Sequence, residues 1–267
     1  MREAGGGTGP GSSSGAEAGV SVVIPAKDEA ERVGATVRAL SGLAHLRRVV
    51  VVDDGSLDAT SRCAAEAGAV VLRHPRTLGK AAALTTGARR VARLDAEAGL
   101  PPSLLLLVDA DLGASAAATA VLVGPVAAGE ADMSIAVLPP QRTAGGGRGF
   151  VVRLSREGIR RATGFTATQP LSGMRCLTRA AFEAALPLAH GWGVETALTI
   201  DLLTAGLRVV EVPCELHHRV TGRDLGGQLH RARQFRDVGR ALVVRRVRHA
   251  VPLRALDRWR DLRRRPR

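Results

Sequence analysis

The sequence is poor in aromatic side chains, and this scarcity argues against a nucleic acid as the partner. The 267 residues include no Tyr, four Phe and two Trp. Proteins that bind single-stranded nucleic acid stack the bases on aromatic rings. The Arg-rich C-terminal region, where such binding would be sought, offers only Phe235 and Trp259. Its positive charge therefore needs another explanation.

Long apolar runs and paired cysteines are also missing. No uninterrupted apolar run approaches the roughly 18 to 20 residues that a membrane-spanning helix needs. Cys63, Cys176 and Cys214 lie far apart and form no C-x-x-C pair, which argues against a disulfide framework and a zinc site. Residues 1–18 are rich in Gly and Ser and lack the apolar block of a secretory signal, so they are predicted to be a disordered leader. We expect a cytoplasmic protein with reduced thiols.

Lysine is nearly absent, and the positive charge comes from arginine near the C-terminus. Lys27 and Lys80 are the only lysines, while sixteen arginines and four acids follow from Arg219 onward, giving +12 of the net charge of +13. We expect residues 225–267 to form a basic amphipathic helical tail. Its first half would dock on residues 19–224, and its last turns would contact an anionic membrane surface at the inner face.

Apolar runs alternate with helical patterns through the first half of the chain. The runs at 20–25, 49–52, 69–72 and 104–108 are Val- and Leu-rich, and segments of helical spacing separate them. This alternation predicts an α/β fold with a mostly parallel central sheet flanked by helices. Ligands of such sheets bind beyond the carboxyl ends of the strands. Three of those ends read "PAKDE", "DDGS" and "DADL", and all three are rich in carboxylates.

Asp109 and Asp111 follow the fourth apolar run directly. Alone, a D-x-D pair has an ordinary explanation, since one Asp caps a helix and the other is an exposed acid. At the end of a buried strand, two carboxylates about 6 to 7 Å apart suit Mg²⁺ or Mn²⁺ shared with phosphate oxygens. The position therefore favours a metal site.

The strand-end motifs together resemble a known family. "VSVVIPAKDEAERV", "VVVVDDGSLDAT", "GKAAALTTG" and "LLLLVDADL" are similar, in this order, to the nucleotide-sugar motifs of family 2 glycosyltransferases with the Rossmann-like GT-A fold. The resemblance covers about residues 20 to 225. "GWGVETALTIDLLTAGLRVVEVPCELHHRVTGRDLGG" resembles polyprenyl-phosphate (dolichol-phosphate) sugar transferases, whereas "GGGRGF", "QPLSG" and "GWGVE" also resemble glucosyl-3-phosphoglycerate synthases.

The resemblance implies a role for individual residues of this sequence. Asp53 would accept a hydrogen bond from the base, and Glu195 would orient or deprotonate the acceptor. The nucleotide-sugar site would comprise Pro25, Glu29, Asp53, Lys80, Asp109, Ala110, Asp111, Arg219 and Arg223. The metal ligands would be Asp109, Asp111 and His218, with Asp111 as the main one, and the acceptor loops would contain Gly147, Arg148, Leu171, Ser172 and Gly173.

Several of these residues also have ordinary explanations. His218 beside His217 could be a surface histidine, Glu195 could cap an apolar helix, and Arg148 could lie in a solvated loop. Asp28 stands where the family usually has Asn, which leaves the effect on that loop open. No strong E-D pair marks an inverting base, so retention and inversion both remain open.

We therefore predict a metal-dependent glycosyltransferase with Mg²⁺ or Mn²⁺ as cofactor. It would move a hexose from a UDP-sugar, or secondarily a GDP-sugar, to a phosphorylated acceptor such as 3-phosphoglycerate or polyprenyl phosphate. A catalytically silent nucleotide-sugar-binding module is one alternative. A nucleotidyltransferase is another, but the glycine-rich loop expected after its first strand is absent from "PAKDEAERV". A homodimer also remains open.

Overall fold

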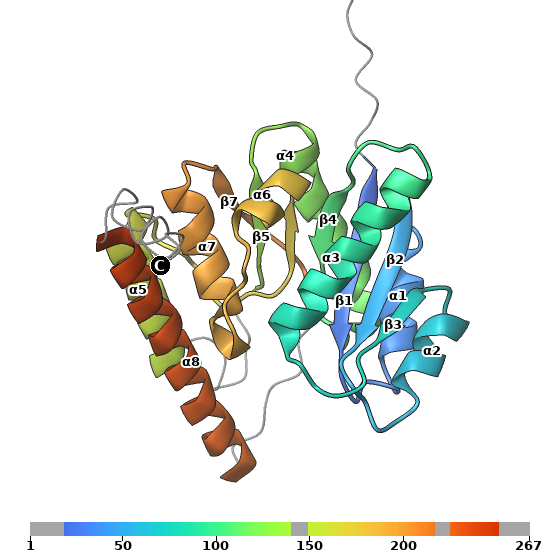
Figure 1. Ribbon diagram of the computed structural model, residues 1–267, viewed down its shortest axis with the longest axis horizontal. Coiled ribbons are helices and arrows are strands. Elements are labelled where there is room, and N and C mark those ends of the chain that lie inside the picture. Colours follow the sequence, from blue (N-terminus) through green and yellow to red (C-terminus); the bar gives the residue numbers. More distant parts are fainter. Residues whose placement is uncertain (1–18, 140–148, 217–224, 251–267) are drawn as a thin grey trace, which may run out of the picture.

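The computed structural model describes residues 19–139, 149–216 and 225–250, with the side chains of the last helix described from 233 to 246. A seven-stranded sheet forms its centre, in the order β3-β2-β1-β4-β6-β5-β7 (Figure 1). Six strands are parallel to one another, and β6 runs antiparallel between β4 and β5. The strands are β1 (Val20–Ala26), β2 (Leu46–Asp53), β3 (Val70–Arg73), β4 (Leu104–Leu107), β5 (Met133–Val137), β6 (Arg175–Leu177) and β7 (Val209–Pro213).

Helices cover both faces of the sheet, as the alternating pattern predicts. One face packs against α1 (Val33–Leu40), α2 (Thr60–Glu66), the 3₁₀ segment η1 (Gly113–Leu122) and α4 (Val123–Ala127). The other packs against α3 (Lys80–Glu97), α6 (Arg179–Ala184) and α7 (Val194–Thr204). Alternate residues of one strand serve the two cores, since Val22 faces the first layer and Val23 the second. This is the α/β class with the mostly parallel sheet expected from the sequence.

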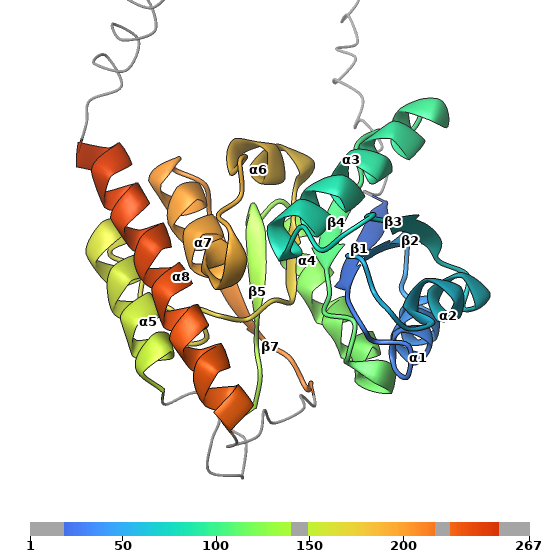
Figure 2. The same cartoon turned by 60° about the horizontal axis from the view of Figure 1, so that its bottom comes forward.

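Two further helices lie beyond α7 at one end of the molecule. α5 (Phe150–Thr163) and α8 (Leu225–Ala250) run side by side there, and α7 lies between them and the sheet (Figures 1 and 2). Buried Val238 and Ala241 face inward, and Arg245 forms a covered salt bridge with Asp201 of α7. Phe235, on the same helix, is 47% exposed. The first half of the basic tail is thus a docked helix.

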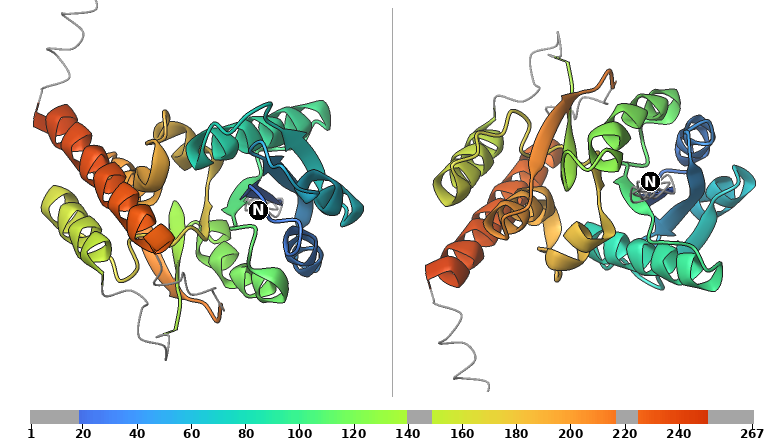
Figure 3. Two further views of the ribbon diagram at one scale, coloured as in Figure 1. Left: turned by 90° about the horizontal axis from the view of Figure 1, so that it is seen from below. Right: turned by 90° about the horizontal axis from the view of Figure 1, so that it is seen from above.

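The carboxyl ends of the parallel strands define the functional edge of the sheet. β1, β2 and β4 lead into the three acidic motifs there, and the antiparallel β6 begins at the same edge, with Arg175 opposite Leu107. Seen along the vertical direction of Figure 1, the strands twist between the two helical layers (Figure 3). No helix among the described residues is long and apolar enough to cross a membrane.

Candidate functional site

The loops that follow β1 and β2 are hydrogen-bonded to each other. The Asp28 amide donates to the Ser56 hydroxyl (2.9 Å), and the Leu57 amide donates to the Asp28 carboxylate (2.8 Å). Asp28 has a φ of 53°, in the left-handed region that Asn and Asp enter more readily than other side chains. The exchange of the family's usual Asn for Asp28 therefore preserves a residue type suited to this turn.

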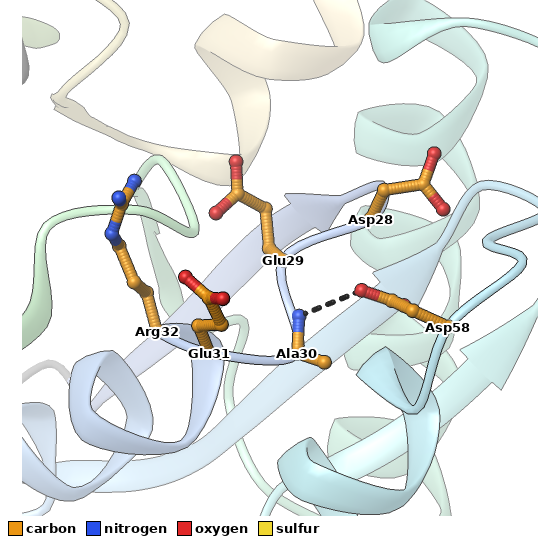
Figure 4. A pocket seen from close by; sticks show the side chains of 6 residues that line it. All are labelled: Asp28, Glu29, Ala30, Glu31, Arg32 and Asp58. Carbon is orange, nitrogen blue, oxygen red and sulfur yellow. Dashed lines mark hydrogen bonds between the residues drawn. The ribbon is translucent and has the colours of Figure 1, made fainter.

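A cavity of about 250 Å³ opens beside these loops. The Ala30 amide donates to Asp58 at its wall (3.1 Å; Figure 4). The Glu29 amide donates to the Thr60 hydroxyl (2.9 Å). Its lining is acidic apart from one arginine and one alanine, and consists of Asp28, Glu29, Ala30, Glu31, Arg32 and Asp58. The structure thus places the predicted site residue Glu29 on the wall of a cavity at the functional edge.

Asp53 ends β2 and is fully buried. Its carboxylate accepts from the Ser56 amide (2.8 Å) and from the Ser61 hydroxyl. Burial alone raises the pKa of Asp53, but these hydrogen bonds, helped by Arg73, hold it below its ordinary value. Asp53 therefore stays ionised and holds the strand end to α2, and its predicted contact with a nucleobase remains a prediction. Pro25 lies beside it in β1, paired with Val52.

Asp54 organises the start of α3. It accepts from the amides of Leu78 and Gly79 (2.8 Å each) and lies 2.7 Å from Nδ1 of the buried His74. Nε2 of His74 lies 3.0 Å from the hydroxyl of Thr86, further along the same helix. Lys80 is the first residue of α3, so this buried network sets the position from which its side chain extends.

Lys80 joins three elements at the centre of the edge. Its ammonium lies 2.8 Å from a carboxylate oxygen of Asp109, just beyond β4, and 2.8 Å from one of Glu195 in α7. Burial alone lowers the pKa of Lys80, but the two carboxylates outweigh it and raise the pKa above its ordinary value. Glu195 is 6% exposed and binds the lysine, so it does more than begin a helix. Lys80 and Asp109 were predicted in one site, but no pattern in the sequence indicates their contact with Glu195.

The D-x-D turn is held from α1. The Thr36 hydroxyl donates to the carbonyl of Ala110 (2.8 Å) and accepts from the Gly113 amide (2.8 Å). Asp111 is partly exposed, and its carboxylate makes no hydrogen bond or ion pair with any described residue. The turn therefore presents one carboxylate engaged by Lys80 and one available to a ligand.

These two carboxylates fit a hard divalent cation, since Mg²⁺ and Mn²⁺ prefer oxygen ligands. Within the described ranges no group of three His, Cys, Asp or Glu side chains has the geometry of a metal site. The third predicted ligand, His218, lies outside those ranges, as do the predicted site residues Arg219, Arg223, Gly147 and Arg148. The fit accordingly rests on Asp109 and Asp111.

The predicted acceptor loop meets the same centre. A Cβ atom on Gly173 would lie 2.6 Å from Asp109 Oδ2 and 2.7 Å from the Lys80 ammonium, so any side chain at this position would displace the ends of these two side chains. Ser172 is buried, and its hydroxyl has no partner among the described residues; Leu171 is partly exposed. The structure therefore brings Lys80, Asp109, Gly173 and Glu195 together.

Arg175 lies beside this cluster and was not among the site residues predicted from the sequence. Its side chain is 1% exposed, and it donates to the Ser172 carbonyl in the acceptor loop (2.9 Å). The sequence signal that could have identified it is its position between Met174 and Cys176, where a charged residue interrupts a short run of strand character.

This architecture defines a Rossmann-like nucleotide-diphospho-sugar transferase of the GT-A class. The model of "Glycosyl transferase family 2" matches residues 21–185, which is more than half of the chain. The chain belongs to this glycosyltransferase family, and the family resemblance seen in its motifs is confirmed.

Solved structures and curated proteins agree with this assignment. Glucosyl-3-phosphoglycerate synthase from Mycobacterium tuberculosis, in complex with Mn²⁺, UDP and phosphoglyceric acid, is 27% identical, with a TM-score of 0.68 over 86% of this chain and 79% of that one. Glycosyltransferase AglJ of Haloferax volcanii is 28% identical over 77% of this chain and 65% of its own length. An uncharacterized protein of Methanocaldococcus jannaschii, MJ1222, is 28% identical over 72% of this chain and 79% of its own.

Proposed function

We propose that this glycosyltransferase moves a hexose from a UDP-sugar to a phosphorylated acceptor with the help of Mg²⁺ or Mn²⁺. The observation that carries the proposal is the cluster at the functional edge, where Lys80 binds Asp109 and Glu195 while the Asp111 carboxylate stays available. The likeness to a synthase crystallised with Mn²⁺, UDP and phosphoglyceric acid supports this choice of donor and cofactor. A GDP-sugar is the second candidate donor.

The donor would lie across the ends of β1, β2 and β4. Glu29 and Pro25 would border the base, with Asp53 behind them, and Ala110 would border the ribose. Asp109 and Asp111 would hold the cation with His218, and the cation would stabilise the negative charge that the nucleoside diphosphate gains when the sugar departs. Arg219 and Arg223 would add positive charge beside the diphosphate.

The acceptor would approach between the 171–173 loop and α7. Glu195 is buried and paired with an ammonium, which suits a carboxylate that orients an acceptor hydroxyl. Lys80 would hold Glu195 and Asp109 at a constant separation and present its charge to the donor phosphates. Gly147 and Arg148 would bind the acceptor's phosphate group from the loop before α5.

Two acceptors fit this arrangement, and the basic tail favours neither by itself. A soluble acid such as 3-phosphoglycerate agrees with the likeness to the synthase. Polyprenyl phosphate agrees with the sequence motif at residues 191–227. It would draw on the tail, where Arg233, Arg236 and Arg240 are exposed on α8, for contact with an anionic membrane surface. We rank the soluble acid first because the structural likeness covers most of both chains.

A donor panel tests the proposal directly. Release of nucleoside diphosphate is measured from UDP- and GDP-sugars with Mn²⁺, Mg²⁺ or EDTA, each with 3-phosphoglycerate, with polyprenyl phosphate in detergent, or with neither. We expect metal-dependent UDP release stimulated by one acceptor, and its absence in Asp111→Ala. UDP binding without turnover for every donor would favour the silent binding module, and diphosphate release from a nucleoside triphosphate and sugar phosphate would favour a nucleotidyltransferase.

A further inference from the structure

Arg175 is a buried cation that no nearby carboxylate pairs with directly. Its side chain is 1% exposed, and no carboxylate of the described residues lies within salt-bridge distance of it. Burial lowers the pKa of Arg175 to about 10, although Glu195, Glu211 and Asp109 act in the opposite direction. The guanidinium is thus charged at neutral pH. Burying such a charge is costly, which calls for a specific role.

The guanidinium uses its donors on two separate elements. Nε donates to the Ser172 carbonyl (2.9 Å), and one terminal nitrogen donates to the Pro170 carbonyl (3.3 Å). The other terminal nitrogen donates to the Thr199 hydroxyl of α7 (2.9 Å) and contacts the Met133 sulfur (3.8 Å). Because the guanidinium is planar, these bonds fix the loop and the helix relative to each other.

Both elements carry residues of the central cluster. The loop ends in Gly173, which packs against Asp109 and Lys80. The Thr199 hydroxyl also donates to the Glu195 carbonyl one turn earlier (3.0 Å), so the arginine is connected to the helical turn that carries the Glu195 side chain. Arg175 itself is paired with Leu107 of β4, two residues before Asp109. Arg175 therefore links the strand through its backbone, and the loop and the helix through its side chain, around the acceptor side.

We propose that Arg175 is the positioning residue of the acceptor side. Its guanidinium holds the 170–173 loop and the start of α7 so that Gly173 and Glu195 flank Lys80 and Asp109. This inference rests on the proposed function for its kinetic consequence. It assigns Arg175 no contact with either substrate, and it leaves the binding of the nucleotide to the β1–β4 half of the edge.

Arg179 offers a matched control in the next helix. It is 9% exposed, and its nearest partners are the Ala88 carbonyl (3.3 Å), in the middle of α3, and Asp95 (3.6 Å), in its last turn. Asp95 binds Ser103, at the opposite edge of the sheet from Lys80. Replacing either arginine removes a buried guanidinium, but only Arg175 lies against the acceptor side.

The experiment compares Arg175→Met and Arg175→Lys with Arg179→Met and Arg179→Lys. All four variants are expected to melt at lower temperature than the wild type. Only the Arg175 pair should lower kcat and raise the acceptor KM, with a loss of about 100-fold in kcat/KM, while UDP affinity with Mn²⁺, measured by calorimetry, is unchanged. Thr199→Val should show a smaller loss of the same kind, because the loop contacts of Arg175 persist.

Hydrogen exchange gives a readout that needs no turnover. Arg175→Met should speed exchange in residues 168–174 and 194–200 and leave exchange in the first turns of α3 as in the wild type. Arg179→Met should leave exchange in residues 168–174 and 194–200 as in the wild type. Equal kinetic and exchange effects in the two Met variants, or wild-type values in a folded Arg175→Met, would overturn the inference. Absence of turnover in the wild type would count against the proposed function alone, since the exchange comparison would still decide the role of Arg175.

Discussion

Charged groups are satisfied by different kinds of partner in the two halves of the functional edge. The nucleotide half lies at the ends of β1, β2 and β4, and the acceptor half comprises the 170–173 loop and α7. At β2, the carboxylates of Asp53 and Asp54 are saturated by amides, hydroxyls and one histidine from their own half. On the acceptor side the charged groups include two cations, the partly exposed Lys80 and the buried Arg175, and both bind partners on other elements. The charges at the end of β2 are therefore satisfied by nearby segments, whereas the acceptor half depends on contacts between segments far apart in the sequence.

Asp111→Asn is expected to cause the largest loss of kcat/KM, because it removes a predicted ligand of the cation that lies between the two halves. Loss of a carboxylate ligand to the cation would remove several kcal/mol of stabilisation of the departing diphosphate, which corresponds to about a 1000-fold fall in kcat/KM. Metal-dependent UDP affinity and turnover are measured in parallel. Glu97→Gln, on the exposed end of α3, serves as the control, and wild-type UDP affinity with Mn²⁺ in Asp111→Asn would disprove the assignment.

Lys80→Met tests whether the central contact couples the halves. Removing one charged donor from a preorganised site costs about 100-fold in kcat, and here it also leaves Glu195 buried without its ammonium partner. Lys27 is the only other lysine and is exposed, so Lys27→Met is the matched control. If Lys80→Met lowered only UDP affinity and spared the acceptor KM, then Lys80 would belong to the nucleotide half alone.

Gly173→Ala tests whether the acceptor half needs the close approach of the 171–173 loop to Asp109. The added methyl group would lie 2.6 Å from the Asp109 carboxylate, so loop or carboxylate must move by several tenths of an ångström. We expect about a 10-fold loss of kcat/KM, less than a full 1 Å displacement would cause. Gly124→Ala in α4 adds a methyl group that meets no atom within 4 Å and should behave as the wild type. Equal kinetics for both variants would show that the loop adapts freely.

The same contrast explains what the sequence could predict. The Val and Leu runs of β1, β2 and β4 and the acids that follow them are local signals, so the sheet, its functional edge and the D-x-D turn were foreseeable. The contact of Lys80 with Glu195 joins residues 115 positions apart in the chain, on two helices with no pattern that pairs them. Arg175 was missed because a lone arginine in a three-residue strand carries no periodic signal.

The smallest predicted effect is on stability in acid, and it tests the hydrogen bonds that Asp54 accepts within the nucleotide half. Burial alone raises the pKa of Asp54, but His74 and the amides of Leu78 and Gly79 bring it below the ordinary value of 3.8. A carboxyl group with a lowered folded pKa stabilises the protein fully above its unfolded pKa, and this contribution disappears as the pH falls through the folded value. Asp54→Asn should therefore be less stable than the wild type at neutral pH. The gap should narrow as the pH falls below 3.8. Denaturant unfolding across this range measures the gap. A gap independent of pH would mean that the charge of Asp54 does not contribute to stability, whereas a narrowing gap would show that the ionised carboxylate stabilises the fold.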